Sequence, residues 1–253
     1  GTPGNTSGST PGYPPARRID LVERLPEANP TFNVADPYRW LEDPDSTESV
    51  AWIQAQDEFA TAELHALPGR AALRTRLTEL LAAGVVTAPA WRGERRFFMR
   101  RTAEQEHAVL VTVDPGGTER ILIDPTTIDP TGTTTLDAWQ PSKEGDLLAY
   151  QVSEGGDEES ILRVIEVATG RLVDGPIDRC RYSPVGWLPG GESYYYVRRL
   201  PASEVPEGEA QFHRRVWLHR VGTDPASDVC VFGGEIDKTT FFSASVSIDG
   251  RWL

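Results

Sequence analysis

A pattern that recurs along the chain after residue 85 constrains the fold more than any other feature. Each copy has a bulky residue, a short polar turn that contains glycine, and then an aromatic or aliphatic run. The turn glycines are Gly93, Gly145, Gly191 and Gly250, and they are separated by 52, 46 and 59 residues. Further short runs rich in Val, Ile, Phe, Tyr and Trp lie between them. About four strands in about 50 residues is the pattern of one β-propeller blade.

A β-sandwich is the alternative interpretation, because it also has short strands joined by Gly- and Pro-rich turns. Sandwich turns come about every 8–12 residues without a longer period, so the long period favours the propeller. We found no helical period after residue 85. The expected strands are 96–100, 108–113, 147–152, 161–167, 194–197 and 216–220.

The number of blades is too small for a closed propeller. At about 52 residues per blade, residues 85–253 provide about three blades and one or two strands of a fourth. Propellers close with about four to eight blades, and an open one leaves a sheet edge exposed. We therefore expect a partial propeller and a polypeptide that is part of a longer one.

The preceding segment, residues 17–84, is predicted to be helical. Asp45 stands three residues before Glu48, as in a capping box, so Asp45 is the expected cap of a helix over 47–67. Apolar residues recur at helical spacing along that helix.

A second helix is predicted over residues 70–83, with its leucines on one narrow face. Gly84 is expected just past its C-terminus in the left-handed conformation. The first 16 residues are rich in Gly, Ser, Thr and Pro, so 1–16 is expected to be a flexible or extended leader. The fold class is thus mainly β, a partial β-propeller preceded by an α-helical N-terminal segment.

The charge balance limits the partners. The chain has 25 Lys and Arg against 38 Asp and Glu, a formal net charge of −13. Nucleic acids and anionic membranes attract basic surfaces, so neither is an expected partner. No apolar run approaches the roughly 20 residues of a membrane span.

Neither the cysteines nor the histidines form a metal-ligand pattern. Cys180 and Cys230 are fifty residues apart and are expected to be two free buried thiols. His213 and His219 fall on one face of a predicted strand, but no third ligand accompanies them. We therefore expect no metal site and no cofactor. The chain also lacks Gly-x-Ser-x-Gly, His-Glu-x-x-His and phosphate-loop motifs, so no catalytic residue is assigned.

Two segments near the N-terminus resemble a known family. The run Asp-Pro-Tyr-Arg-Trp-Leu-Glu-Asp-Pro-Asp over 36–45 and the run Ala-Trp-Ile-Gln-Ala-Gln over 51–56 are similar to the N-terminal signature of the prolyl oligopeptidase family of serine peptidases. Shorter likenesses follow at 149–150, 219–224 and 247–252, so the resemblance covers about 20–253. Oligopeptidases B, which cleave after basic residues, usually have Arg-Asp in place of Glu42-Asp43.

The resemblance implies an architecture. In the family, an N-terminal helical segment packs on an α/β-hydrolase domain, and a seven-bladed propeller, about 364 residues at this spacing, precedes the rest of that domain. The catalytic Ser, Asp and His lie in the hydrolase domain, so none is carried over to this chain. Residues 36–43 would be structural, with Trp40 and Leu41 as buried anchors.

The resemblance also implies two substrate-binding positions. Tyr182, five residues before Trp187, matches a family aromatic residue that contacts bound peptide from the propeller. Cys230 matches a cysteine near the active site of some members. From the residues alone, Tyr182 is equally a blade-core or rim aromatic residue, and Cys230 a buried strand thiol.

The functional expectation is the N-terminal and propeller portion of a proline-specific serine oligopeptidase. The propeller would restrict access to short proline-containing peptides and keep water from a catalytic domain outside this chain. The alternatives are a non-catalytic peptide-binding scaffold and an oligopeptidase B-like specificity for basic residues. The expected location is cytoplasmic, and the leader leaves a secreted or periplasmic location open.

Overall fold

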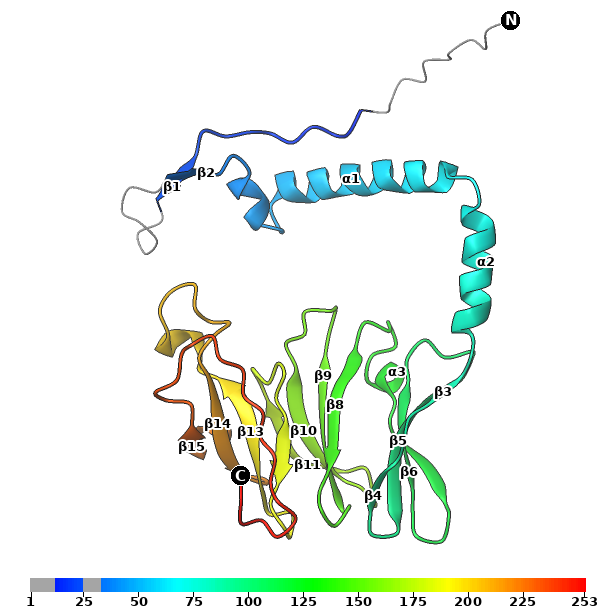
Figure 1. The fold of residues 1–253 in the computed structure, drawn as a ribbon, viewed down its shortest axis with the longest axis vertical. Coiled ribbons are helices and arrows are strands. Elements are labelled where there is room, and N and C mark those ends of the chain that lie inside the picture. The colour runs from blue at the N-terminus through cyan, green and yellow to red at the C-terminus, as the bar shows by residue number, and fades with distance from the viewer. Residues whose placement is uncertain (1–11, 25–32) are drawn as a thin grey trace, which may run out of the picture. The chain divides into compact units, whose positions relative to one another are not determined.

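The computed structural model describes residues 12–24 and 33–253 (Figure 1). Internal contacts divide the chain into two compact units, Gly1–Leu80 and Leu81–Leu253. Most of the predicted leader lies outside the described residues. Its last residues are extended and contact helix α1 (Thr47–Ala66): the Tyr13 ring lies 4.9 Å from the Phe59 ring, and Gln56 donates a hydrogen bond to the Pro14 carbonyl.

The first unit is not wholly helical, which corrects the prediction for 17–84. Strands β1 (Val22–Arg24) and β2 (Asn33–Ala35) pair in antiparallel fashion before the 3-10 helix η1 (Arg39–Glu42). Helix α1 follows, and then α2 (Arg70–Leu81). Trp40 and Leu41, predicted as buried anchors, are only half-buried. The Trp40 indole donates to the Arg17 carbonyl at 2.9 Å.

Helix α1 begins at Thr47 as predicted, but its N-cap lies one residue after the predicted one. Ser46, not Asp45, is the N-cap: its backbone is extended and its hydroxyl accepts a hydrogen bond from Ser49 N at 3.2 Å. Asp45 instead donates its own N–H to the Asp43 carboxylate. Gly84 does not take a positive φ, so the predicted left-handed ending of the second helix is also wrong.

The apolar stripes of the two helices are exposed. Ile53, Leu64 and Leu67 are 50%, 51% and 55% exposed, and α2 buries none of its residues. Contiguous apolar surface on this scale marks a face that another surface covers. None of the described helices is long and apolar enough to cross a membrane.

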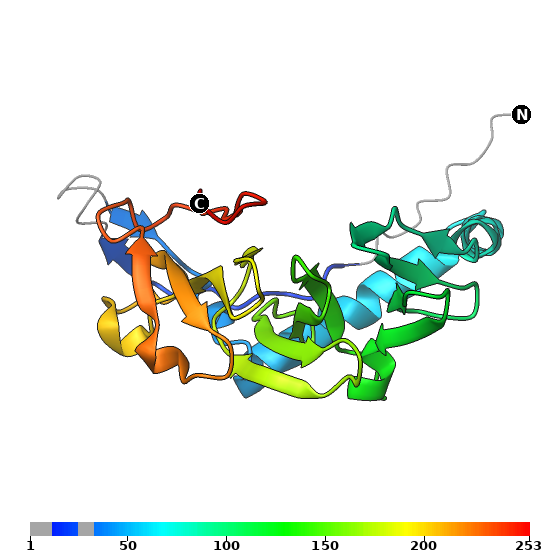
Figure 2. The same cartoon turned by 90° about the horizontal axis from the view of Figure 1, so that it is seen from below.

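The second unit consists of three antiparallel sheets, and this confirms the predicted partial propeller (Figure 2). The strands of the last two sheets follow one another in sequence order. The first sheet contains β3 (Val85–Val86), β4 (Ala90–Arg92), β5 (Arg95–Arg101), β6 (Val109–Val113) and β7 (Glu119–Ile123). The second contains β8 (Thr135–Pro141), β9 (Leu147–Ser153), β10 (Ile161–Glu166) and β11 (Leu172–Ile177). The third contains β12 (Val185–Trp187), β13 (Ser193–Arg199), β14 (Arg214–Arg220) and β15 (Val229–Phe232).

Three short helical turns connect these strands, although the sequence predicted none. Helix α3 is Pro125–Ile128, and the 3-10 helices η2 and η3 are Ala202–Glu204 and Pro225–Ser227. Each of α3 and η3 starts with proline after a capping aspartate, Asp124 or Asp224. One turn is too short to produce a hydrophobic period, which is why the pattern missed them.

Three of the four repeated glycine turns share one hydrogen-bond pattern. Ser142 N donates to Leu147 O, and Gly145 N donates to Ser142 O. The same pair of bonds recurs at 188–193 and at 247–252. The fourth copy of the sequence pattern therefore forms the same turn that joins the first two strands of the second and third sheets. Val246, just before this turn, lies against Gly186 of β12.

The core lies between successive sheets. Phe97, Leu110, Leu148 and Ile165 belong to a cluster between the first two sheets. The middle sheet also uses its other face, because Ala149 and Leu162 belong to a second cluster with Trp187, Tyr194 and Tyr196. Burial of both faces explains why these strands lack the alternation of a half-exposed sheet.

Candidate functional site

His219 and the partners around it form a buried charge network on the third sheet. The imidazole is fully buried, with Nδ1 2.7 Å from Asp228 Oδ1 and Nε2 2.9 Å from Asp174 Oδ2. The Nε2 contact has the distance of an ion pair but not the geometry of a hydrogen bond. Tyr194 and Tyr196 donate their hydroxyls to the same two carboxylates.

This network does not provide a catalytic base. Burial alone would lower the pKa of His219, but the two carboxylates outweigh it and raise the pKa to about 9. Both ring nitrogens face carboxylates, so neither is free to take a proton from a nucleophile. His213 lies outside the strand and contacts Glu209 instead. The described residues include no group of three or more His, Cys, Asp or Glu placed to hold a metal ion.

A second group of residues lies at one end of the blades, where the loops after β9, β11 and β13 meet. The described non-glycine residues with positive φ all lie in these loops: Glu158, Arg179, Tyr182 and His213 have φ between 56° and 59°. Side chains other than glycine rarely adopt this conformation, and residues held in it concentrate at functional sites. Backbone hydrogen bonds stabilise this conformation. Arg199 N donates to Arg179 O at 3.3 Å, and Leu200 N donates to His213 O at 3.2 Å.

Tyr182, one of the two predicted substrate-binding residues, is at the centre of this group. Its side chain is 55% exposed, and its hydroxyl donates to Glu158 Oε2 at 2.6 Å. Arg181 also binds Glu158 and stacks on the Tyr182 ring with its guanidinium carbon 5.0 Å from the ring centre. The Phe241 ring lies 5.9 Å away on the surface. The fold therefore presents Tyr182 as a fixed rim aromatic residue, not as a core residue.

Phe241 is supported in the same way by a second arginine. Arg214 lies 4.0 Å from the centre of the Phe241 ring, and Phe241 is 62% exposed. Tyr182 and Phe241 thus each have an arginine guanidinium against the ring. This cation–π contact fixes the orientation of the ring, so the two exposed rings form a rigid apolar surface. No sequence pattern indicates Phe241, Arg181 or Arg214, because nothing in their spacing distinguishes them from ordinary residues of loops and strand ends.

A hollow of about 530 Å³ opens beside Tyr182. Its walls include Asp137, Glu158, Arg181, Phe242 and Ser243, which come from β8, the loops after β9 and β11, and the chain after β15. The hollow combines apolar surface with one cation and two carboxylates. This combination suits binding of a peptide side chain.

Cys230, the other predicted substrate-binding residue, is exposed on β15, which corrects the expectation of two buried thiols. Strand β15 is an edge strand of the third sheet, and all four of its residues are exposed. Cys230 is opposite Trp217, and its thiol is 3.7 Å from the Phe232 carbonyl oxygen. Cys180 is buried as predicted.

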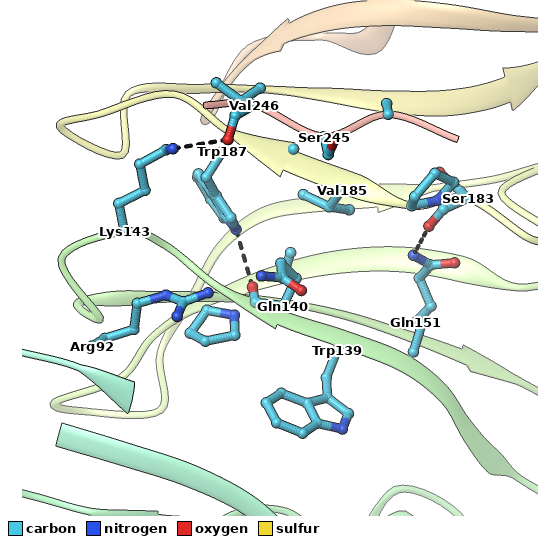
Figure 3. A pocket seen from close by; sticks show the side chains of 16 residues that line it. Arg92, Trp139, Gln140, Lys143, Gln151, Ser183, Val185, Trp187, Ser245 and Val246 are labelled. Atoms are coloured by element: carbon cyan, nitrogen blue, oxygen red, sulfur yellow. Dashed lines mark hydrogen bonds between the residues drawn. The ribbon is translucent and has the colours of Figure 1, made fainter. Parts of the chain in front are cut away.

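A separate hollow of about 320 Å³ lies along the first strands of the blades (Figure 3). Arg92 and Lys143 border it, and none of its lining residues is acidic. Both cations are used in joining blades: Arg92 donates to Ser142 O at 3.0 Å, and Lys143 to Val246 O at 3.1 Å. Trp187 likewise donates its indole N–H to Gln140 O. We interpret these contacts as blade-to-blade attachment.

Comparisons with known proteins agree with this fold. The family described as "Prolyl oligopeptidase, N-terminal beta-propeller domain" matches residues 14–253. The prolyl endopeptidase of Elizabethkingia meningoseptica is 30% identical over 222 residues, which are 87% of this chain and 31% of that protein. Prolyl oligopeptidase A of Galerina marginata is 26% identical over 271 residues, covering 95% of this chain and 36% of that protein.

Solved structures give the same result. One of them comes from a study of two prolyl endopeptidases and the role of inter-domain dynamics in their catalysis and specificity. It matches with a TM-score of 0.83 and 31% identity, over 95% of this chain and 35% of that one. Prolyl oligopeptidase B of Galerina marginata, bound to a 35-residue substrate, has the same fold with a TM-score of 0.76 at 19% identity, over 94% of this chain and 36% of that one. The chain thus spans about a third of the length of the relatives it matches.

Proposed function

The chain belongs to the prolyl oligopeptidase family, and on that premise we propose that it is the N-terminal helical and propeller portion of a serine peptidase that cleaves short peptides after proline. The observation that carries the proposal is the match of residues 14–253 to the family's propeller domain. The catalytic serine, its base and its carboxylate would come from a hydrolase domain of the same polypeptide.

The exposed helices support the expected partner. The uncovered leucines of α2 and the stripe of α1 need an apolar surface against them, and the proposed hydrolase domain would provide it. We also propose that the propeller limits entry to short peptides. In this proposal Tyr182 contacts bound peptide from the rim, and Cys230 contributes from β15. A cytoplasmic location belongs to the same proposal, and cell fractionation would test it.

The test uses the longer polypeptide from the same gene and the 253-residue chain side by side. A fluorophosphonate probe labels an activated serine, and intact mass gives the size of the labelled species. We expect labelling of a species well above 27.9 kDa, with cleavage of a chromogenic Gly-Pro anilide and not of the Gly-Ala or Gly-Arg anilide. The 253-residue chain should show neither labelling nor cleavage.

The outcomes separate the alternatives. Preference for the Gly-Arg anilide would indicate the oligopeptidase B-like specificity. Absence of any labelled species, together with retained binding of proline peptides, would favour the non-catalytic scaffold. Hydrolysis by the verified 253-residue chain would contradict the assignment of the catalytic residues to another domain.

A further inference from the structure

Three arginines gather behind the Tyr182 rim with too few carboxylates to balance them. Arg181 pairs with Glu158, and Arg199 pairs with Glu159. Arg214 makes no ion pair among the described residues; it donates to the Gln211 carbonyl at 3.2 Å and lies over Phe241. In ion pairs, the three guanidinium groups therefore have two carboxylates. Asp137, the other carboxylate of the hollow, accepts a hydrogen bond from Ser160 and forms no ion pair with them among the described residues.

Burial makes this imbalance costly. Arg199 and Arg214 are only 6% and 5% exposed, and the Nε of all three arginines is buried without a hydrogen-bond partner in the described part of the chain. Burial and the nearby charges of Arg199 and Arg181 lower the pKa of Arg214. Buried cations that repel one another are retained at sites where an anion compensates them.

Only one of the three arginines borders the hollow beside Tyr182; Arg199 lines a separate hollow of about 490 Å³. Arg181 borders the hollow of about 530 Å³ beside Tyr182, whereas Arg199 and Arg214 do not line it. A carboxylate in the hollow would contact Arg181 directly. The positive charges of Arg199 and Arg214 would also attract it, and low solvent access strengthens this attraction. The exposed aromatic pair of Tyr182 and Phe241 would support the apolar part of the same ligand.

The charges on the surrounding surface do not attract an anionic ligand from a distance. The same loops carry exposed carboxylates at Glu154, Asp157, Glu204 and Glu207. They repel anions at a distance, so only a ligand held in the hollow gains from the arginines. This arrangement discriminates by contact, and its effect belongs in KM.

We propose that Arg181, with Arg199 and Arg214 behind it, forms a subsite for a carboxylate of the bound peptide, so that the enzyme prefers proline peptides with an acidic group near the cleaved bond. This inference rests on the proposed function, because the peptide is positioned by the hydrolase domain. Arg181 contacts the substrate, and Arg199 and Arg214 are positioning residues that set its field.

The experiment uses the longer polypeptide that contains this chain and matched proline peptides. Each pair differs only by Glu against Gln, placed in turn at every position on either side of proline. A further pair, with a free or an amidated C-terminus, distinguishes a side-chain carboxylate from a terminal one. We expect kcat/KM about tenfold higher for the acidic member at one position, mainly through KM.

The variants test the residues. Arg181→Gln should bring the two members of that pair within about twofold of each other, and Arg214→Met should reduce the ratio about threefold. The matched control is Arg220→Gln, which removes the same charge from an exposed residue at the opposite end of β14 and should leave the ratio unchanged. Because each variant is compared with itself on two substrates, a general loss of activity cancels from the ratio.

The failures are distinguishable. Cleavage after proline with no acidic preference at any position, or a preference that survives Arg181→Gln, would overturn the subsite and leave the proposed function intact. A preference lost equally in Arg220→Gln would show that net charge, not this subsite, produces it. Absence of cleavage of every proline peptide would overturn the proposed function and the subsite together.

Discussion

The third sheet carries two charge clusters built in opposite ways. At one end, His219 has a carboxylate at each ring nitrogen, and two tyrosine hydroxyls satisfy the carboxylates. At the other, three arginines form ion pairs with only two carboxylates, and Arg214 forms none among the described residues. We call the first the matched cluster because each ring nitrogen of its cation faces a carboxylate, and the second the unmatched cluster because Arg214 has no carboxylate partner among the described residues. A buried cation with carboxylate partners contributes to stability, whereas one without a partner costs stability. The difference indicates which end of the blades holds the sheets together and which end is available to a ligand.

The largest effect should come from breaking the matched cluster. Replacing His219 by Gln removes the cation and leaves Asp174 and Asp228 buried without compensation. We expect a loss of about 3–5 kcal/mol in the free energy of unfolding, measured by urea denaturation followed by tryptophan fluorescence. As a control, Tyr196→Phe removes one hydroxyl and should cost about 1 kcal/mol. Equal costs for the two variants would contradict the matched-charge interpretation.

The same cluster should make stability depend on pH. The folded pKa of His219, about 9, is above its unfolded value of about 6.5, so the folded state binds the proton more tightly. The stabilisation is fully present below pH about 6.5 and is lost as the pH rises through about 9, about 3 kcal/mol in all. Urea midpoints across this range test it. His219→Gln should flatten the profile, and a flat wild-type profile would refute the coupling.

Removing a cation from the unmatched cluster should have a much smaller effect on stability. Arg214→Met loses the hydrogen bond to Gln211 and the contact with Phe241 but also removes repulsion from Arg181 and Arg199. These contributions oppose each other, so we expect a change within about 1 kcal/mol in either direction. The same urea titration measures it. A loss as large as that of His219→Gln would show that the arginines are a structural network.

The two cysteines provide a chemical probe that needs no mutation. Burial raises the pKa of the Cys180 thiol to about 12, and Cys180 packs among the residues of the inter-sheet core. Cys230 is exposed. Iodoacetamide at pH 8 should therefore alkylate Cys230 and leave Cys180 unmodified, as read by peptide mass spectrometry. Both should react in urea, and alkylation of Cys180 in the native protein would show that the core opens.

The sequence predicted the elements of the second unit well because their signals are local. Six runs chosen for their Val, Ile and aromatic content fall on β5, β6, β9, β10, β13 and β14. The wrong predictions also concern neighbouring residues or short segments. Ser46 is the N-cap in place of the predicted Asp45, and strands β1 and β2 pair in a segment that was predicted to be helical. Asp and Ser are both common N-cap residues, so the sequence alone does not show which of Asp45 and Ser46 adopts the extended conformation that capping requires.

The candidate site was predictable only in part. Tyr182 came from the family resemblance, and the structure places it on an exposed rim, although its contact with peptide remains a prediction. Its neighbours Glu158, Phe241 and Arg214 are 24, 59 and 32 residues away along the chain. No spacing rule connects residues so far apart, because their proximity depends on how three loops end at the same edge of the blades.

The sequence by itself determined the four-strand repeat, the helical segment before it and the family, since each is written in side-chain periodicity, turn residues or a continuous signature. The tertiary structure decided which charges meet. It paired His219 with Asp174 and Asp228, gathered three arginines around two glutamates, and left Cys230 on an outer strand. The physical reason is that periodicity sets which face a residue occupies, whereas electrostatic balance depends on the distances between faces of different strands and loops.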